Sequence, residues 1–282
     1  MGVESGIARV NNTSLWYEVA GEGPPLVLIH GFSLDSRMWD AQFAAFARER
    51  RVVRYDLRGF GRSALPGTEP FGHHEDLNAL LAYLGIRQAD VLGLSLGGMV
   101  AIDFALAYPD TARSLVPVDA LFSGYRFSQD WDERTGLVWE LAREFGVEAA
   151  KASWLDHPLF APLAERPEAA ACVRRMVGEY SGWHVINDNP ARSPRPPAAE
   201  RLRDLAMPLL VIVGERDLPD FQRMAEMLAT EAPLARRVVI PGAGHMASME
   251  DPAAFNRLLL DFLRTLPASG PSLGPSPRPS AA

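Results

Sequence analysis

Short apolar runs that alternate with stretches of helical periodicity limit most strongly what this chain can fold into. Turn residues bound these runs, which occupy residues 26–29, 51–55, 89–93, 114–118, 209–213 and 237–240. Helical periodicity is clearest in residues 74–84, 97–107 and 252–266. Continuous apolar runs of this length suit parallel strands buried on both faces, with helices as the crossover connections. Residues 7–20 alternate around two asparagines, which predicts a β-hairpin. The chain is therefore predicted to be an α/β protein with a mostly parallel sheet covered on both faces.

Residues 122–200 interrupt this alternation. They are rich in tryptophan and in helix-forming residues, contain no convincing strand, and end in the proline-rich segment NPARSPRPPAAE, which suits an extended connection. We interpret them as a helical cap inserted between two parts of a core domain, residues 1–121 and 201–266. The last segment, residues 267–282, is rich in Pro, Ser, Gly and Ala, and is expected to be a disordered tail.

A G-x-S-x-G motif lies where one apolar run meets a helical stretch. The segment GLSLG, residues 93–97, follows ADVL and precedes GMVAIDFALAYP, which is the strand, sharp turn and helix that a nucleophilic serine elbow requires. Such a turn would hold Ser95 in a strained conformation with its hydroxyl exposed, and only glycine would fit at positions 93 and 97. The alternative, a glycine-rich turn without chemistry, fits this context less well. Ser95 is the candidate nucleophile.

A serine hydroxyl needs a base to take its proton, and His245 is the best placed of six histidines. It lies in PGAGHMASMEDP, on a glycine-rich loop between the last apolar run and the last helical stretch, late enough for the order serine, acid, histidine. The other five histidines are expected to orient a loop (His30), to start a helix (His73, His74), or to be structural or to line a pocket (His157, His184).

The acid should hold the histidine ring in the correct tautomer. Asp217 follows the run 209–213 in the segment GERDLPD and lies between serine and histidine in the chain. Asp119 is the main competitor, because it directly follows the run 114–118, where some members of such folds carry the acid. Asp220 is a weaker competitor, since it is expected to open a helix. We favour Asp217.

An oxyanion hole needs two backbone N–H donors near the serine. The Leu96 amide, at the start of a helix, is one candidate. The other is the Phe32 amide, because the run 26–29 ends in His30-Gly31-Phe32, a strand-end turn of the type that supplies this donor. The Phe32 side chain would then form pocket wall.

Composition excludes several other classes of function. The formal net charge of -7 provides no basic surface for nucleic acid. The single cysteine, Cys172, cannot form an intrachain disulfide, and no Cys/His cluster indicates a metal, so no metal or other cofactor is predicted. The N-terminus has no signal-peptide pattern, and no apolar run is long enough to span a membrane, so a cytoplasmic location without membrane association is expected. The sequence does not predict the oligomeric state.

The segments VLIHGF, YDLRGFGRS, VLGLSLGGMVA, VGERD and PGAGHMASMEDP, in this order and spacing, resemble the α/β-hydrolase superfamily. They are most similar to its branch of esterases, 3-oxoadipate enol-lactonases and cofactor-free haloperoxidases. The resemblance covers about residues 7–120 and 200–266. It implies the α/β-hydrolase fold, with an eight-stranded, mostly parallel sheet and a helical cap over the variable substrate site. It also implies that residues 56–63 form a structural turn.

The expected activity is that of a serine hydrolase acting on a small-molecule carboxylic ester or lactone through an acyl-enzyme. An enol-lactonase is the first alternative, but it would need a cation at the pocket, for which Arg126, Arg174 and Arg175 are candidates in the cap. A carbon–carbon bond hydrolase fits less well, because such relatives usually carry Asn where this chain has Leu94. A non-catalytic pocket-binding protein is the remaining alternative, although such relatives often lose the histidine or the acid. The aromatic cap and acidic net charge favour a neutral, apolar substrate group.

Overall fold

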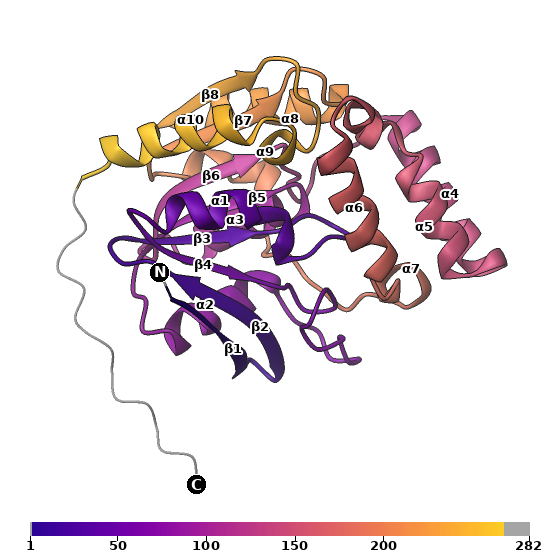
Figure 1. Cartoon of the computed structure of the whole chain (residues 1–282), viewed down its shortest axis with the longest axis horizontal. Helices are drawn as coiled ribbons and strands as arrows, with labels where there is room; N and C mark the ends of the chain where they lie inside the picture. Colours follow the sequence, from indigo (N-terminus) through magenta and orange to yellow (C-terminus); the bar gives the residue numbers. More distant parts are fainter. Residues whose placement is uncertain (1, 268–282) are drawn as a thin grey trace, which may run out of the picture.

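The computed structural model describes residues 2–267, and its strands form one eight-stranded sheet in the order β1-β2-β4-β3-β5-β6-β7-β8 (Figure 1). The strands are β1 (Val3–Val10), β2 (Thr13–Ala20), β3 (Pro25–Ile29), β4 (Arg51–Tyr55), β5 (Ala89–Leu94), β6 (Ala112–Val118), β7 (Leu209–Gly214) and β8 (Ala235–Ile240). The β1–β2 and β2–β4 pairs are antiparallel, and every other pair is parallel. The predicted mostly parallel sheet is confirmed.

The strands form where the apolar runs predict them, because a strand covered on both faces needs apolar side chains on both. All residues of β5 and β7 are buried, as expected for interior strands that helices cover on both faces. The hairpin of β1 and β2 turns at Asn11 and Asn12, which have φ values of 45° and 54°. Asparagine tolerates this left-handed conformation better than most residues, which explains the tight turn.

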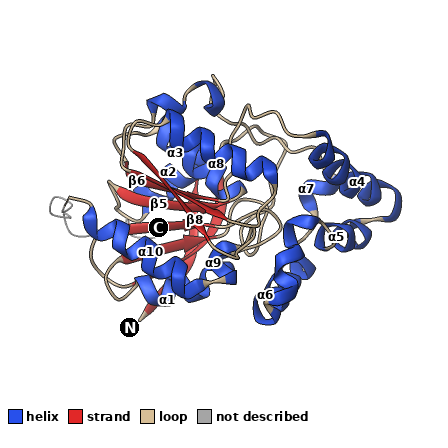
Figure 2. Ribbon diagram, turned by 90° about the horizontal axis from the view of Figure 1, so that it is seen from above, coloured by secondary structure: helices blue, strands red, loops and turns tan. Residues whose placement is uncertain are grey.

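Helices cover both faces of the sheet. Figure 2 shows α1, α9 and α10 on one face and α2, α3 and α8 on the other. These helices are α1 (Asp40–Phe46), α2 (His73–Tyr83), α3 (Leu96–Ala107), α8 (Pro219–Glu231), α9 (Ala247–Glu250) and α10 (Pro252–Thr265). Short 3₁₀ helices also lie at Ser36–Trp39, Ala198–Glu200 and Leu202–Asp204. No helix within residues 2–267 is both long and apolar enough to cross a lipid bilayer.

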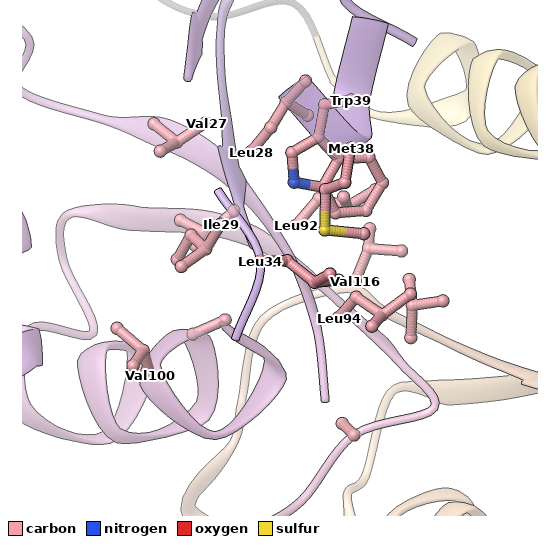
Figure 3. Close-up of a cluster of buried hydrophobic side chains, with 14 of the residues drawn as sticks. Val27, Leu28, Ile29, Leu34, Met38, Trp39, Leu92, Leu94, Val100 and Val116 are labelled. Carbon is pink, nitrogen blue, oxygen red and sulfur yellow. The ribbon is translucent and has the colours of Figure 1, made fainter. Parts of the chain in front are cut away.

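Side chains from β3 divide between the two faces of the sheet, as the period of two requires. In Figure 3, Val27 and Ile29 point toward the side of Val100 on α3, whereas Leu28 points toward Trp39. Trp39 is fully buried and packs on Phe255 of α10, with 6.2 Å between ring centroids. The apolar core therefore packs against both faces of the central strands, whose carboxyl ends carry the candidate site.

The residues between β6 and β7 form a helical insertion, which Figure 2 shows grouped beside the sheet. Its helices are α4 (Gln129–Phe145), α5 (Val147–Leu155), the 3₁₀ helix Pro158–Glu165, α6 (Pro167–Glu179) and α7 (Trp183–Ile186). They lie inside the range 122–200 predicted for the cap. The domain boundaries themselves stay predictions, and residues 268–282 of the predicted tail lie outside the described residues.

Candidate active site

Ser95 occupies a strained turn between β5 and α3. Its φ and ψ are 55° and -115°, a conformation that non-glycine residues rarely adopt unless the surrounding structure imposes it. The neighbouring chain imposes it here. A Cβ at Gly93 would come within 2.0 Å of the Gly97 carbonyl oxygen, and one at Gly97 within 2.2 Å of the Ile29 carbonyl oxygen. Glycine is required at both positions, as the motif predicts.

The backbone of Ser95 is held on both sides. Its N–H donates to the Val118 carbonyl at 3.0 Å, and its own carbonyl accepts from the N–H groups of Met99 and Leu121 at 3.0 and 3.2 Å. The residue as a whole is 8% exposed. The strained turn is therefore fixed in place before any ligand binds, which is what a nucleophile needs.

His245 and Asp217 meet across the loops that follow β7 and β8. The Nδ1 atom of His245 lies 2.9 Å from Oδ2 of Asp217, and both side chains are almost fully buried. The other carboxylate oxygen of Asp217 accepts the Leu218 N–H at 2.7 Å. On His245, Nε2 has no hydrogen-bond partner among residues 2–267. Because Nδ1 faces the acid, Nε2 is the nitrogen available to accept a proton.

Glu250 holds the loop that carries His245, a role the sequence did not reveal. Its two carboxylate oxygens accept the N–H groups of Gly244 at 2.8 Å and Met246 at 3.0 Å, the residues on either side of the histidine. Burial raises the pKa of Glu250 above its ordinary value. The signal in the sequence was an acidic residue five positions after His245, just before the proline that opens α10. The buried Glu250 carboxylate thus holds the backbone on both sides of His245.

The two alternative acids take different places. Asp119 is fully buried, has φ of 43°, and accepts the Gly214 N–H at 2.8 Å. Burial, followed by the negative charge of Asp217, raises the pKa of Asp119 well above its ordinary value. Asp220 lies in the first turn of α8 and accepts hydrogen bonds from Ser128 and Tyr125. Asp220 therefore ties the insertion to the core, and Asp217 is the acid bonded to His245.

Among residues 2–267, one group has the donor types and closeness to hold a metal ion. Donor atoms of Asp119, Asp217 and His245 all lie within 4.8 Å of one another, and all three residues are buried. The same three groups are engaged otherwise, since His245 faces Asp217 and Asp119 binds the Gly214 amide. The geometry suits an acid–base pair with a second carboxyl behind it.

The remaining histidines have structural contacts. His30 bridges two loops, with Nδ1 2.8 Å from the Gly31 carbonyl and Nε2 accepting the Leu57 N–H at 2.9 Å. His73 and His74 start α2, as predicted. Burial lowers the pKa of His73 to about 3 and those of His157 and His184 to about 4. None of these five histidines contacts Asp217.

The backbone N–H groups of Phe32 and Leu96 are the predicted oxyanion-hole donors. Leu96 is the first residue of α3, so its N–H has no partner within the helix. The Phe32 N–H donates to no other group among the described residues. Both residues line the same cavity as Ser95 and His245. The Phe32 ring forms wall, as expected, and it packs edge-on against Trp154 of α5 at 5.6 Å.

The cavity beside Ser95 has a volume of about 190 Å³ and is enclosed by both the core and the insertion. The core contributes Ser95, His245 and apolar residues, and the insertion contributes three tryptophans, Thr135 and two further apolar side chains. Arg126, Arg174 and Arg175, the predicted candidates for a substrate-binding cation, are exposed and do not line the cavity. The lining therefore carries no side chain with a permanent charge.

The loop of residues 56–63 is structural, as predicted. The Asp56 carboxylate accepts the Ser36 and Arg62 N–H groups, each at 2.8 Å, and Ser63 Oγ donates to the Asp56 carbonyl at 2.6 Å. These bonds support the loop that bears Phe32, because Leu57 also donates to His30.

Comparison with known proteins agrees with this architecture. The model of the "Alpha/beta hydrolase family" matches residues 26–258. The chain belongs to the alpha/beta hydrolase family. An esterase from Thermogutta terrifontis, solved with malate bound, is 30% identical with a TM-score of 0.80, and the match covers 93% of this chain and 99% of that one. The family match and such relatives support hydrolase activity on esters or related bonds.

Two further members of the family are similar over nearly their whole length. The enol-lactonase from Burkholderia xenovorans LB400 is 26% identical with a TM-score of 0.77, covering 92% of this chain and all of that one. The pimeloyl-[acyl-carrier protein] methyl ester esterase of Yersinia enterocolitica is 27% identical over 274 residues, covering 88% of this chain and 96% of the relative. The resemblance inferred from the motifs is confirmed, and the substrates of these relatives differ.

Proposed function

We propose that this protein hydrolyses carboxylic esters or lactones of small molecules through an acyl-enzyme on Ser95. The observation that carries the proposal is the His245–Asp217 contact of 2.9 Å beside a cavity that also exposes the strained Ser95. A strained serine, an oriented histidine and a buried acid are the parts that acyl transfer by serine requires. The names of the similar esterases and lactonases support the same class of bond.

In the first half of the reaction, His245 Nε2 takes the proton of Ser95 Oγ as that oxygen attacks the ester carbonyl carbon. The negative charge that develops on the carbonyl oxygen is stabilised by the N–H groups of Phe32 and Leu96. The bond between that carbon and the alcohol oxygen then breaks, and His245 gives its proton to the leaving alcohol. Asp217 holds the ring so that Nδ1 keeps its hydrogen and stabilises the imidazolium.

In the second half, water replaces the alcohol. His245 takes one proton from the water as its oxygen attacks the acyl carbon, and the same two amides hold the oxyanion. The bond from the acyl carbon to Ser95 Oγ breaks, and the proton on His245 returns to the serine. The products are the carboxylic acid and free enzyme. A lactone follows the same steps, with the alcohol remaining attached to the acid product.

A panel of p-nitrophenyl esters and simple lactones tests this proposal, with the Ser95→Ala variant as control. The wild type should turn over at least one member of the panel, and the variant should lose activity by several orders of magnitude. Turnover should also survive exhaustive EDTA treatment, because no step uses a metal. Activity lost to EDTA and restored by zinc would indicate that Asp119, Asp217 and His245 hold an ion instead.

A further inference from the structure

The side chains that line the cavity come from both the core and the insertion. Almost none of them could neutralise a charge on a bound substrate. Fifteen residues line it, and their only polar side-chain groups are the Ser95 hydroxyl, the His245 ring, the Thr135 hydroxyl and the tryptophan N–H groups. Ser95 and His245 are assigned to the reaction in the proposal above. The Thr135 hydroxyl donates to the Trp131 carbonyl of its own helix. Little polar capacity therefore remains for the substrate.

Of the tryptophan N–H groups in the lining, that of Trp154 already has a hydrogen-bond partner. Trp154 donates its N–H to Ser33 Oγ at 2.7 Å, a buried bond between the insertion and the loop after β3. The faces of Trp131, Trp139 and Trp154 line the cavity together with the rings of Phe32 and Phe160. Aromatic walls of this kind favour another ring or an alkyl chain, through dispersion and edge-to-face contacts.

A carboxylate placed in this cavity would lose hydration without gaining a cationic partner. Burying an unpaired ion costs far more free energy than burying an apolar group of the same size. Arg126, Arg174 and Arg175 in the insertion are exposed and do not line the cavity, and two further arginines are already paired. Arg37 binds Asp35 and Glu179, and Arg216 binds Glu165.

The volume of the cavity sets a size as well. A closed apolar cavity of ~150 Å³ accommodates one benzene molecule, and this one measures about 190 Å³. Its volume therefore matches a single ring with a short linker, or a chain of about four to six carbons.

We propose that the half of the ester entering this cavity is uncharged and apolar, such as a single ring or a short alkyl chain. The proposal rests on the proposed esterase function and adds its substrate class. It follows from a lining that includes Thr135 and three tryptophans but no arginine or lysine.

Two matched substrate series test the proposal on the purified full-length protein. In the first, the leaving group is p-nitrophenol and the acyl group is butyrate, phenylacetate, or the monoester of succinate. In the second, butyrate is esterified either to phenol or to 4-hydroxybenzoate, whose phenolic oxygens are leaving groups of similar strength. Whichever half enters the cavity should reject its carboxylate, so kcat/KM should fall at least 100-fold in at least one series. Equal kcat/KM for charged and neutral members of both series would overturn the proposal.

Thr135→Arg provides a gain-of-function arm, with Thr135→Met as the control of similar length without charge. Thr135→Arg should reduce the ratio of kcat/KM for the neutral substrate to kcat/KM for the carboxylate substrate at least tenfold. Thr135→Met should leave this ratio unchanged. Circular dichroism establishes that both variants are folded, and the wild-type comparison stands without them. If no ester of either series is hydrolysed, the proposed function fails and not the substrate class alone.

Discussion

The carboxyl groups of Asp119 and Asp217 lie side by side behind His245, with donor atoms of the three residues within 4.8 Å of one another. One oxygen of Asp119 accepts the Gly214 N–H, and the other is buried without a hydrogen-bond partner among residues 2–267. The raised pKa of Asp119, caused first by burial and then by the charge on Asp217, favours its protonated form. Of these two adjacent carboxyls, Asp119 is the one whose pKa is raised, and Asp217 is the one that faces the histidine.

Replacing each aspartate by asparagine should separate their roles. Asp217→Asn offers an N–H where His245 needs an acceptor, so the wrong tautomer forms and kcat should fall by roughly a thousandfold or more. Asp119→Asn should lower kcat less than tenfold, because the amide oxygen can still accept the Gly214 N–H and the side chain keeps its size. Both variants are measured on one ester, with folding checked by circular dichroism.

The opposite ranking would move the acid of the triad from Asp217 to Asp119. Two unimpaired variants would mean that neither carboxylate supports the histidine. Either result can be interpreted, because asparagine has nearly the same size as the aspartate that it replaces.

The sequence predicted the parts of the site whose geometry depends on residues close together in the chain. GLSLG lies between a strand pattern and a helix pattern, so Ser95 and its two glycines could be placed from residues 93–97 and the segments that flank them. The order of residues in the chain then favoured His245 and Asp217. The contact between them depends on packing of the β7 and β8 loops, which only the structure reveals.

Contacts between distant segments could not be predicted in the same way. Glu250 clamps the His245 loop through two backbone amides, and no pattern marks a glutamate as a backbone acceptor rather than a surface charge. The hydrogen bond from Trp154 to Ser33 joins residues 121 positions apart. Tryptophan enrichment in residues 122–200 predicted an aromatic cap, but not which tryptophan reaches the core.

That long-range bond leads to a prediction about Trp154. Ser33 follows Phe32, has φ of 61°, and is buried, so its hydroxyl helps to hold the loop that presents the Phe32 amide. Trp154→Phe keeps a ring and removes the N–H, and kcat should fall about tenfold with little change in KM. Steady-state kinetics on a small neutral ester measures the split.

Ser33→Ala should cause the same loss, and the double variant little more, because both remove one bond. Trp183→Phe, on α7 and outside the cavity lining, is the matched control and should leave kcat unchanged. A rise in KM with unchanged kcat would show that Trp154 acts only as pocket wall.

His184 should make the stability of the fold depend on pH. Its ring stacks on Phe60 of the core at 4.3 Å, and burial lowers its pKa from 6.5 to about 4. Between these values the unfolded chain binds a proton that the folded chain does not, so stability is lost as pH falls from about 6.5 to about 4. Between pH 7 and pH 5, this pKa difference at His184 lowers the free energy of unfolding by about 2 kcal/mol.

Urea denaturation of wild type and His184→Gln at both pH values measures this contribution. The variant should lose about 2 kcal/mol less than wild type on acidification, whatever its absolute stability. An identical pH dependence in the two proteins would contradict the burial of a neutral His184.

The most direct test of the account is covalent labelling of the serine. A fluorophosphonate probe reacts with a serine hydroxyl that a neighbouring base has activated, so it reports the nucleophile without requiring the natural substrate. Peptide mass spectrometry of the labelled wild type should place the adduct on Ser95, and Ser95→Ala should remain unlabelled and inactive on p-nitrophenyl esters. An adduct on another residue, or ester hydrolysis that persists undiminished in Ser95→Ala, would contradict the assignment of Ser95 as the nucleophile.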